Sequence, residues 1–323
     1  TLTYKYYVDE VPDLLKDFCN FCLEEYATFK YPESKALKKW TIRTDNNGGY
    51  DMWNRTNLNN KRTYDSIILK EGLIEEFKSD LQYFIDNREE YYQLGFQYSR
   101  GYLLCGKPGC GKTSLIKAVA NSLQRDIICL NLNLVNNSDH LEKLFQNVKF
   151  ESVIVLIEDI DCMTDIVKNR EEKKKLEEEE NKKKQKEKND DGFGMNKNNK
   201  KKEEQTLTLS DILNFFSGVN DYDGRITFFT SNHPEKLDPA LYRSGRVDRT
   251  FELGHCDHDQ IKRFYKLLMK TDIPDATLKL FEPGKYSPAD IVNYFFRYKN
   301  SPNYETLILE NIDKMNEKSF DQN

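Results

Sequence analysis

The segment from Gly101 to Ser114 constrains the fold of this chain more than any other. It fills every defined position of the pattern G-x-x-x-x-G-K-[ST], with Gly106, Gly111, Lys112 and Thr113. An apolar run precedes the pattern and a helix-forming run follows it. A strand, a tight loop and a helix in this order form the loop that cradles phosphate groups in α/β proteins. The sequence therefore predicts a phosphate-binding loop in an α/β fold, rather than a chance glycine-rich turn.

The residue types of this loop suit a nucleoside triphosphate. Glycine lets the backbone curl until its N–H groups face the phosphates, and the helix that follows adds the positive end of its dipole. Lys112 is expected to reach the β- and γ-phosphates, and the Thr113 hydroxyl to ligate Mg²⁺. The predicted ATP-binding residues are Gly106, Lys107, Pro108, Gly109, Cys110, Gly111, Lys112, Thr113 and Ser114.

Acidic residues follow a second apolar strand. The run Val153–Ile157 is succeeded by Glu158, Asp159 and, after one apolar residue, Asp161. Carboxylates at the end of a parallel strand beside a phosphate loop are placed for Mg²⁺ and for the attacking water. A solvated acidic turn is the alternative, and the phosphate loop upstream disfavours it.

Two further groups of polar residues come later in the chain. Asn232 follows the next predicted strand, where a neutral amide can hold water or sense the γ-phosphate, although asparagine is also a common turn residue. Arg243 and Arg246 lie three residues apart. They are either surface charge or arginine fingers that serve a neighbouring subunit by stabilising transition-state charge.

Alternating strands and helices predict an open, doubly wound parallel sheet. We expect strands over 102–105, 126–130, 153–158, 226–230 and 250–253, with helices over 67–91, 112–123, 138–148 and 207–219. Three domains are predicted: a separate α+β domain over 1–62, a nucleotide-binding domain over 63–256, and a helical lid over 257–323. The first contains a strand over 1–8, a helix over 11–29 and a turn over 45–49, and the lid contains helices over 260–269, 288–298 and 304–315.

Charge and composition narrow the classes of function. Residues 168–205 carry 14 Lys and Arg against 11 Asp and Glu, within a chain of net charge −5. With few apolar residues, this segment is predicted to be a disordered surface insertion, in preference to a binding tail. The acidic remainder disfavours nucleic acid as a partner. No run is long and apolar enough to span a membrane, so membrane association is expected only through a segment absent from this chain.

The order of these motifs resembles the AAA+ ATPase family, and more closely its Bcs-type subfamily, which includes a mitochondrial protein translocase and plant ATPases. The closer resemblance is carried by residues 62–69, 101–104, 157–161, 208–210, 232–241 and 287–289. It covers the chain except for the insertion and the last few residues.

The resemblance implies a role for each matching residue. Lys112 and Thr113 would bind phosphate and Mg²⁺, Glu158 would hold Mg²⁺, and Asp159 would orient the water. Asn232 would act as the first sensor, and Arg243 and Arg246 as arginine fingers. Glu158 and Asp159 stand in the reverse of the order common in AAA+ proteins, Ser244 replaces a usual proline, and no lid arginine matches the second sensor.

As a function, the resemblance implies a homo-oligomeric ring, hexameric or heptameric, that hydrolyses ATP to remodel or translocate a protein client. The loop over 131–137 lacks the aromatic and glycine residues of threading unfoldases, which favours a folded or partly folded client. Mitochondrial inner membrane or another intracellular membrane is the expected location. The alternatives are a nucleotide-gated scaffold with little turnover, a nucleic-acid motor or loader, and a nucleotide kinase; the last leaves the arginine pair and residues 1–62 without a role.

Overall fold

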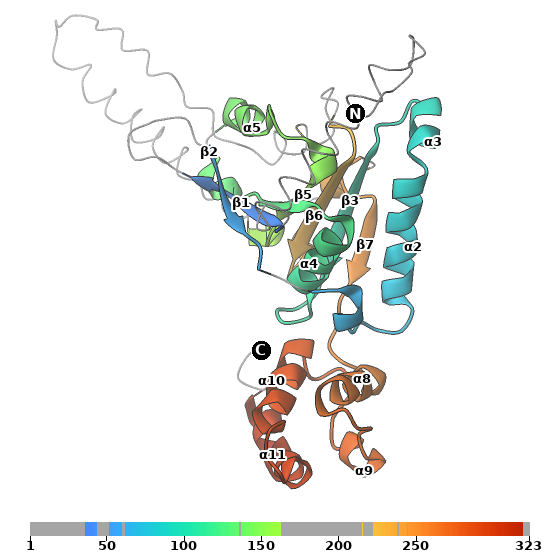
Figure 1. Ribbon diagram of the computed structural model, residues 1–323, viewed down its shortest axis with the longest axis vertical. Coiled ribbons are helices and arrows are strands. Elements are labelled where there is room, and N and C mark those ends of the chain that lie inside the picture. The colour runs from blue at the N-terminus through green and yellow to red at the C-terminus, as the bar shows by residue number, and fades with distance from the viewer. Residues whose placement is uncertain are drawn as a thin grey trace, which may run out of the picture.

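The computed structural model describes residues 36–43, 52–59, 62–135, 137–162, 215, 222–237, 239–243 and 245–318. A seven-stranded sheet lies above a separate group of C-terminal helices (Figure 1). The predictions for 1–8, 11–29, 45–49 and 168–205, nearly all of the helix predicted over 207–219, and Ser244 lie outside the described residues. Within the described residues, no helix is long and apolar enough to cross a membrane.

The sheet has the strand order β2-β1-β4-β5-β6-β3-β7. Every neighbouring pair is parallel except β1 and β2. This topology confirms the predicted doubly wound α/β fold, in which the carboxyl ends of the parallel strands meet at one edge. The strands are β1 (Lys38–Arg43), β2 (Met52–Asn57), β3 (Ser99–Cys105), β4 (Asp126–Cys129), β5 (Val153–Ile157), β6 (Arg225–Ser231) and β7 (Arg249–Glu252).

Both faces of the sheet are buried, which explains why its central strands are continuously apolar. Along β3, Tyr102 and Leu104 face one core and Leu103 faces the other. The Tyr102 side is covered by α2 (Leu73–Asp86) and α4 (Lys112–Leu123). The Leu103 side is covered by α5 (Ser138–Phe145) and by loops.

The antiparallel strands β1 and β2 are continuous with the central sheet, whereas the sequence placed them in a separate domain over 1–62. Lys39 on β1 pairs with Ile127 on β4. The carboxylate of Asp126 accepts hydrogen bonds from the backbone N–H of Lys38 and the indole N–H of Trp40, both at 2.8 Å. These long-range contacts are invisible in a local sequence pattern.

The predicted helix over 67–91 is divided in the structure. It consists of α2 and a short α3 (Arg88–Gln93), separated by Asn87. The side-chain amide of Asn87 donates to the carbonyl of Tyr83 at 2.8 Å, so it binds the last turn of α2. Short polar side chains compete with helical hydrogen bonds in this way, and they favour helix ends.

The C-terminal helices pack around a core of their own, formed by α8 (His258–Met269), α9 (Asp275–Leu278), α10 (Pro288–Tyr298) and α11 (Tyr304–Lys318). Capping boxes at Asp257 and Ser287 begin α8 and α10. The short α9 was not predicted. Short 3-10 helices occur at Tyr64–Ser66, Leu132–Leu134, Phe150–Ser152, Pro234–Lys236 and Pro239–Tyr242.

Candidate functional site

The glycine-rich loop joins β3 to α4 at the carboxyl edge of the sheet. Gly106, Gly109 and Gly111 all have positive φ, at 142°, 83° and 97°. A Cβ on Gly106 would lie 2.0 Å from the carbonyl oxygen of Leu253, and a Cβ on Gly109 would lie 2.8 Å from the Ser287 hydroxyl. The loop is therefore enclosed between the end of β7 and the start of α10, and its curvature requires glycine.

Lys112 is buried at the first position of α4, with 8% of its surface exposed. Its ammonium group donates to the carbonyl of Gly106, to that of Lys107 at 3.2 Å, and to the Asn232 side-chain oxygen at 2.7 Å. Burial lowers the pKa of Lys112. A buried cation held by three acceptors at the mouth of a glycine loop is suited to a polyphosphate.

The predicted acidic and amide residues converge next to this lysine. The Thr113 hydroxyl donates to Glu158 Oε1 at 3.2 Å, and the Asn232 side-chain amide donates to Asp159 Oδ1 at 3.0 Å. Asn232 therefore connects Lys112 to Asp159 through its two polar atoms. Residues from three strand ends, β3, β5 and β6, form one hydrogen-bonded cluster.

Asp159 has an unusual backbone conformation. Its φ is 49°, in the left-handed region that residues other than glycine seldom adopt. Its N–H donates to the hydroxyl of Thr230 on β6 at 3.0 Å. Such conformations cost about 1–3 kcal/mol and persist where surrounding contacts impose them, often at functional sites.

Asp161 has a role that the sequence did not assign. It is 3% exposed, and its carboxylate accepts the backbone N–H of Asn232 at 3.2 Å. The third carboxylate of the acidic run therefore positions the amide residue of the neighbouring strand. The signal in the sequence was its spacing two residues after Asp159.

The start of α10 also lies at the site, although the sequence did not predict it there. The N–H of Ala289 donates to the carbonyl of Gly109 at 3.2 Å. The first turn of α10 carries Pro288, Ala289 and Asp290, and Asp290 is engaged in a capping box with Ser287. The helical region thus reaches the glycine loop through backbone contact.

The donor set fits the groups that the sequence predicts. Thr113 and Glu158 present a hydroxyl and a carboxylate, the hard oxygen ligands that Mg²⁺ prefers. Mg²⁺ is usually held by one or two protein ligands together with substrate phosphates and water, and this pair can supply the protein's share. No group of three or more His, Cys, Asp or Glu residues in the described ranges is arranged to hold a metal ion.

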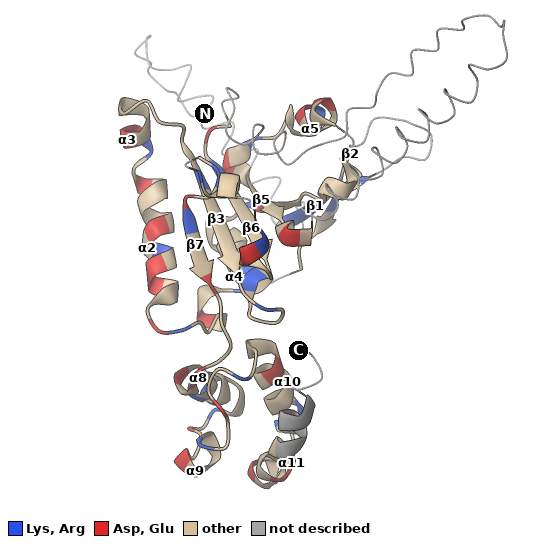
Figure 2. Ribbon diagram, turned by 180° about the vertical axis from the view of Figure 1, so that it is seen from behind, with Lys and Arg blue, Asp and Glu red and all other residues tan. Residues whose placement is uncertain are grey.

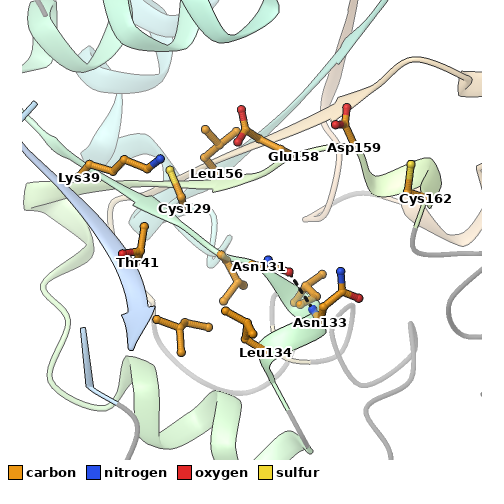
Figure 3. A pocket seen from close by; sticks show the side chains of 13 residues that line it. Lys39, Thr41, Cys129, Asn131, Asn133, Leu134, Leu156, Glu158, Asp159 and Cys162 are labelled. Atoms are coloured by element: carbon orange, nitrogen blue, oxygen red, sulfur yellow. Dashed lines mark hydrogen bonds between the residues drawn. The ribbon is translucent and has the colours of Figure 1, made fainter. Parts of the chain in front are cut away.

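A cavity of about 490 Å³ adjoins the acidic cluster on the side of β1 and β4. Glu158 and Asp159 line one side of it, and Lys39 and Thr41 on β1 line another (Figure 3). Asn131 and Asn133, from the loop after β4, complete the wall, where the Asn131 side chain accepts the N–H of Asn133 at 3.0 Å. Thus the loop after β4 shares a cavity with Asp159.

The arginine pair lies on the turn between the last 3-10 helix and β7. Arg243 is exposed, whereas Arg246 is half-buried and donates to the carbonyl of Ala240 at 2.9 Å. The backbone of Arg246 lies against Gly101, within β3. Gly106, where the glycine loop begins, follows Gly101 by five residues along the chain, which corresponds to about 16 Å of extended strand. The turn is therefore attached to β3 at a distance from the glycine loop of its own chain.

Charge is mixed over the surface of the described residues. Acidic side chains follow one another along α2, with Lys and Arg interspersed on neighbouring elements (Figure 2). Arg100 on β3 and Arg249 on β7 pair with acids of α2, namely Asp80 and Glu76. These two arginines therefore form ion pairs between the sheet and α2.

Comparison with known protein families matches residues 102–255 to the ATPase family associated with various cellular activities (AAA). An AAA-ATPase of Arabidopsis thaliana is 37% identical over 251 residues, which are 75% of this chain and 50% of the relative. The mitochondrial chaperone BCS1 of Homo sapiens is 34% identical over 247 residues, which are 75% of this chain and 53% of the relative. The chain spans about half the length of these relatives.

Proposed function

Because residues 102–255 form a domain of the AAA ATPase family, and of its Bcs type, we propose that this chain hydrolyses ATP as one subunit of a ring that remodels or translocates a protein client. ATP and Mg²⁺ are the proposed substrate and cofactor. Six or seven copies are the proposed ring sizes.

The observation that carries this proposal is the cluster in which Asn232 joins Lys112 to Asp159. Its two hydrogen bonds, at 2.7 and 3.0 Å, connect a phosphate-binding cation to a candidate water-orienting carboxylate. A residue in that position can couple the state of the γ-phosphate to the position of Asp159. A simple phosphate-binding loop does not need such a connection.

In the proposed mechanism the loop N–H groups and Lys112 bind the phosphates. Thr113 and Glu158 would hold Mg²⁺, which would supply positive charge to the β- and γ-phosphates. Asp159 accepts a hydrogen bond from the attacking water and orients it, and Asn232 keeps the Asp159 carboxylate in place. The negative charge that develops in the transition state requires further cations to stabilise it.

We assign those cations to Arg243 and Arg246 of a neighbouring subunit. The support is their anchoring beside Gly101, about 16 Å of strand away from Gly106 within the same chain. Arg243 is exposed and available to another copy. Arginine fingers supplied in trans raise hydrolysis rates about 10³- to 10⁵-fold.

For the client, we propose a folded or partly folded protein. The loop over 131–137 consists of asparagine, leucine and valine in the sequence, without the aromatic and glycine residues of a threading loop. Its residues Asn131 and Asn133 share a cavity with Asp159, so client contact there can influence hydrolysis. The human relative is named as a mitochondrial chaperone, and we propose a mitochondrial or other intracellular membrane as the location of this chain.

The client hypothesis is tested by limited proteolysis of a candidate client before and after ATP turnover. We expect the protease pattern of the transported client to remain that of its folded form. Global unfolding of the client during turnover would contradict the hypothesis and would favour threading of an unfolded client.

Hydrolysis is tested with Asp159→Asn. We expect this variant to bind ATP with about the wild-type affinity but to lose at least about 100-fold in kcat, because a neutral amide accepts a hydrogen bond from the attacking water less strongly than the carboxylate that orients it. A wild-type ring that binds ATP yet turns over no faster than Asp159→Asn would instead favour the nucleotide-gated scaffold.

A further inference from the structure

The turn that carries the arginine pair is fastened to β3 by one carboxylate. Asp248 accepts the N–H of Gly101 on Oδ2 at 2.7 Å and the N–H of Gly245 on Oδ1 at 3.2 Å. Its own N–H donates to the carbonyl of Gly101 at 2.8 Å. The side chain thus bridges the strand and the turn, and bonds to an ionised acceptor are the stronger kind.

Close packing adds to these hydrogen bonds. A Cβ on Gly101 would lie 1.7 Å from the carbonyl oxygen of Arg246, so the turn rests directly on the strand backbone. Val247, between Arg246 and Asp248, is 6% exposed and belongs to the core of the sheet. Close packing therefore fixes the position of the turn on β3 and leaves it little room to shift.

A buried arginine also forms a hydrogen bond to the turn that carries the arginine pair. Arg225, at the start of β6, is 2% exposed, and its guanidinium donates to the carbonyl of Gly245 at 3.4 Å. Burial lowers its pKa to about 10, and the charges of Tyr222 and Asp248 act in the opposite direction. Arg225 is therefore a cation at neutral pH, and its hydrogen bond to Gly245 ties the turn to the start of β6.

We propose that Asp248 is the positioning residue of the arginine turn: it holds Arg243 and Arg246 in the geometry in which they serve a neighbouring copy of this chain. The inference rests on the proposed function, since it assumes that these arginines act in trans. Asp248 binds β3 at Gly101, away from the glycine loop, so its own subunit's ATP site does not depend on it.

This placement predicts an asymmetric defect. A subunit with Asp248→Ala should bind ATP normally and should hydrolyse it when its neighbour supplies an intact arginine turn. The same subunit should fail as an arginine donor. In rings made only of Asp248→Ala, kcat should fall about 10- to 100-fold, the effect of misplacing a catalytic group by about 1 Å, while KM for ATP changes little.

Mixed rings separate the two roles of a subunit. Asp248→Ala mixed with Asp159→Asn should recover activity, because Asp159→Asn subunits donate good arginines to the intact sites of Asp248→Ala subunits. Asp248→Ala mixed with Arg246→Ala should not recover, since both lack a working turn. Arg246→Ala mixed with Asp159→Asn is the reference for arginines acting in trans.

Matched variants guard against a general folding defect. Asp223→Ala removes a carboxylate near the start of β6 that bonds to Arg88 at 2.7 Å and to Tyr92, both on α3 rather than on the arginine turn. It should hydrolyse ATP within about twofold of the wild type, as expected for a half-buried carboxylate that does not contact the arginine turn. Asp248→Asn keeps one acceptor oxygen, so its rate should fall between those of Asp248→Ala and the wild type.

The results distinguish failure of the inference from failure of the proposed function. If the Arg246→Ala reference mixture does not recover, the arginines do not act in trans and the proposed function is wrong on this point. If the reference recovers but Asp248→Ala with Asp159→Asn does not, the positioning role is overturned. Wild-type kcat in Asp248→Ala, or loss of its ATP binding or ring assembly, would also overturn it.

Discussion

At the scale of the residue, the site depends on a lysine whose charge is buried. The ammonium group of Lys112 is held by two loop carbonyls and by Asn232. Burying a cation is costly unless acceptors surround it. This arrangement keeps the charge at the mouth of the loop, where the phosphates of a nucleotide can replace or supplement the carbonyl partners.

Replacing Lys112 with alanine should therefore weaken ATP binding at least about 10- to 100-fold, the value of one or two hydrogen bonds to a charged group. Isothermal titration with a non-hydrolysable ATP analogue measures this. Lys117→Ala, further along α4, is the matched control and should bind as the wild type does. Equal affinity of Lys112→Ala and the wild type would contradict the assignment of the loop.

The sequence predicted which residues meet at the site but not how they are held there. Lys112, Thr113, Glu158, Asp159 and Asn232 all converge, because parallel strands deliver their carboxyl ends to one edge. The contacts of Thr230 with Asp159 and of Asp161 with Asn232 each join residues 71 positions apart. Such contacts depend on β5 and β6 being neighbours, which local patterns do not specify.

At the scale of the element, α2 is fixed to the sheet by aromatic packing. Phe77 is fully buried, and its ring lies 5.2 Å from that of Tyr102 on β3 and 5.3 Å from that of Phe251 on β7. β3 leads into the glycine loop and β7 follows the arginine turn. Phe77 therefore packs on the strand that leads into the glycine loop and on the strand that follows the arginine turn.

Phe77→Ala should lower the free energy of unfolding by about 3–5 kcal/mol, through lost burial and the cavity left behind. Urea unfolding followed by circular dichroism measures the change. Tyr83→Ala is the comparison, since Tyr83 lies on the same helix but is 53% exposed; it should cost about 0.5 kcal/mol or less. A similar small loss for Phe77→Ala would show that α2 does not stabilise the sheet.

For two helices that begin at clear start signals, the sequence predicted the correct first and last residues. The predictions for 112–123 and 288–298 match α4 and α10, which begin after a glycine of positive φ and at a capping box. The helix predicted over 67–91 began too early, because α2 starts only at Leu73, and it missed the break at Asn87 between α2 and α3. The hairpin of β1 and β2 was assigned to a separate domain, because its pairing with β4 is a long-range contact.

At the scale of the whole molecule, the sheet and the helical region meet at the glycine loop. Ala289 on α10 bonds to Gly109, and Gln260 on α8 donates to the carbonyl of Ile68 at 3.4 Å. Nucleotide in the loop therefore lies where two bodies with separate cores touch. We propose the helical region as a lid whose position responds to the nucleotide, with the arginine turn facing the next copy.

The most direct test of a ring ATPase is the hydrolysis rate per subunit as a function of protein concentration, with particle mass measured on the same samples. We predict a rate that rises as six- or seven-subunit particles form, and no such rise for Asp159→Asn. In the proposed mechanism each site needs its neighbour's arginines, so the rate per subunit should follow the fraction of protein in rings. A rate per subunit that stays constant from monomer to ring would contradict the account.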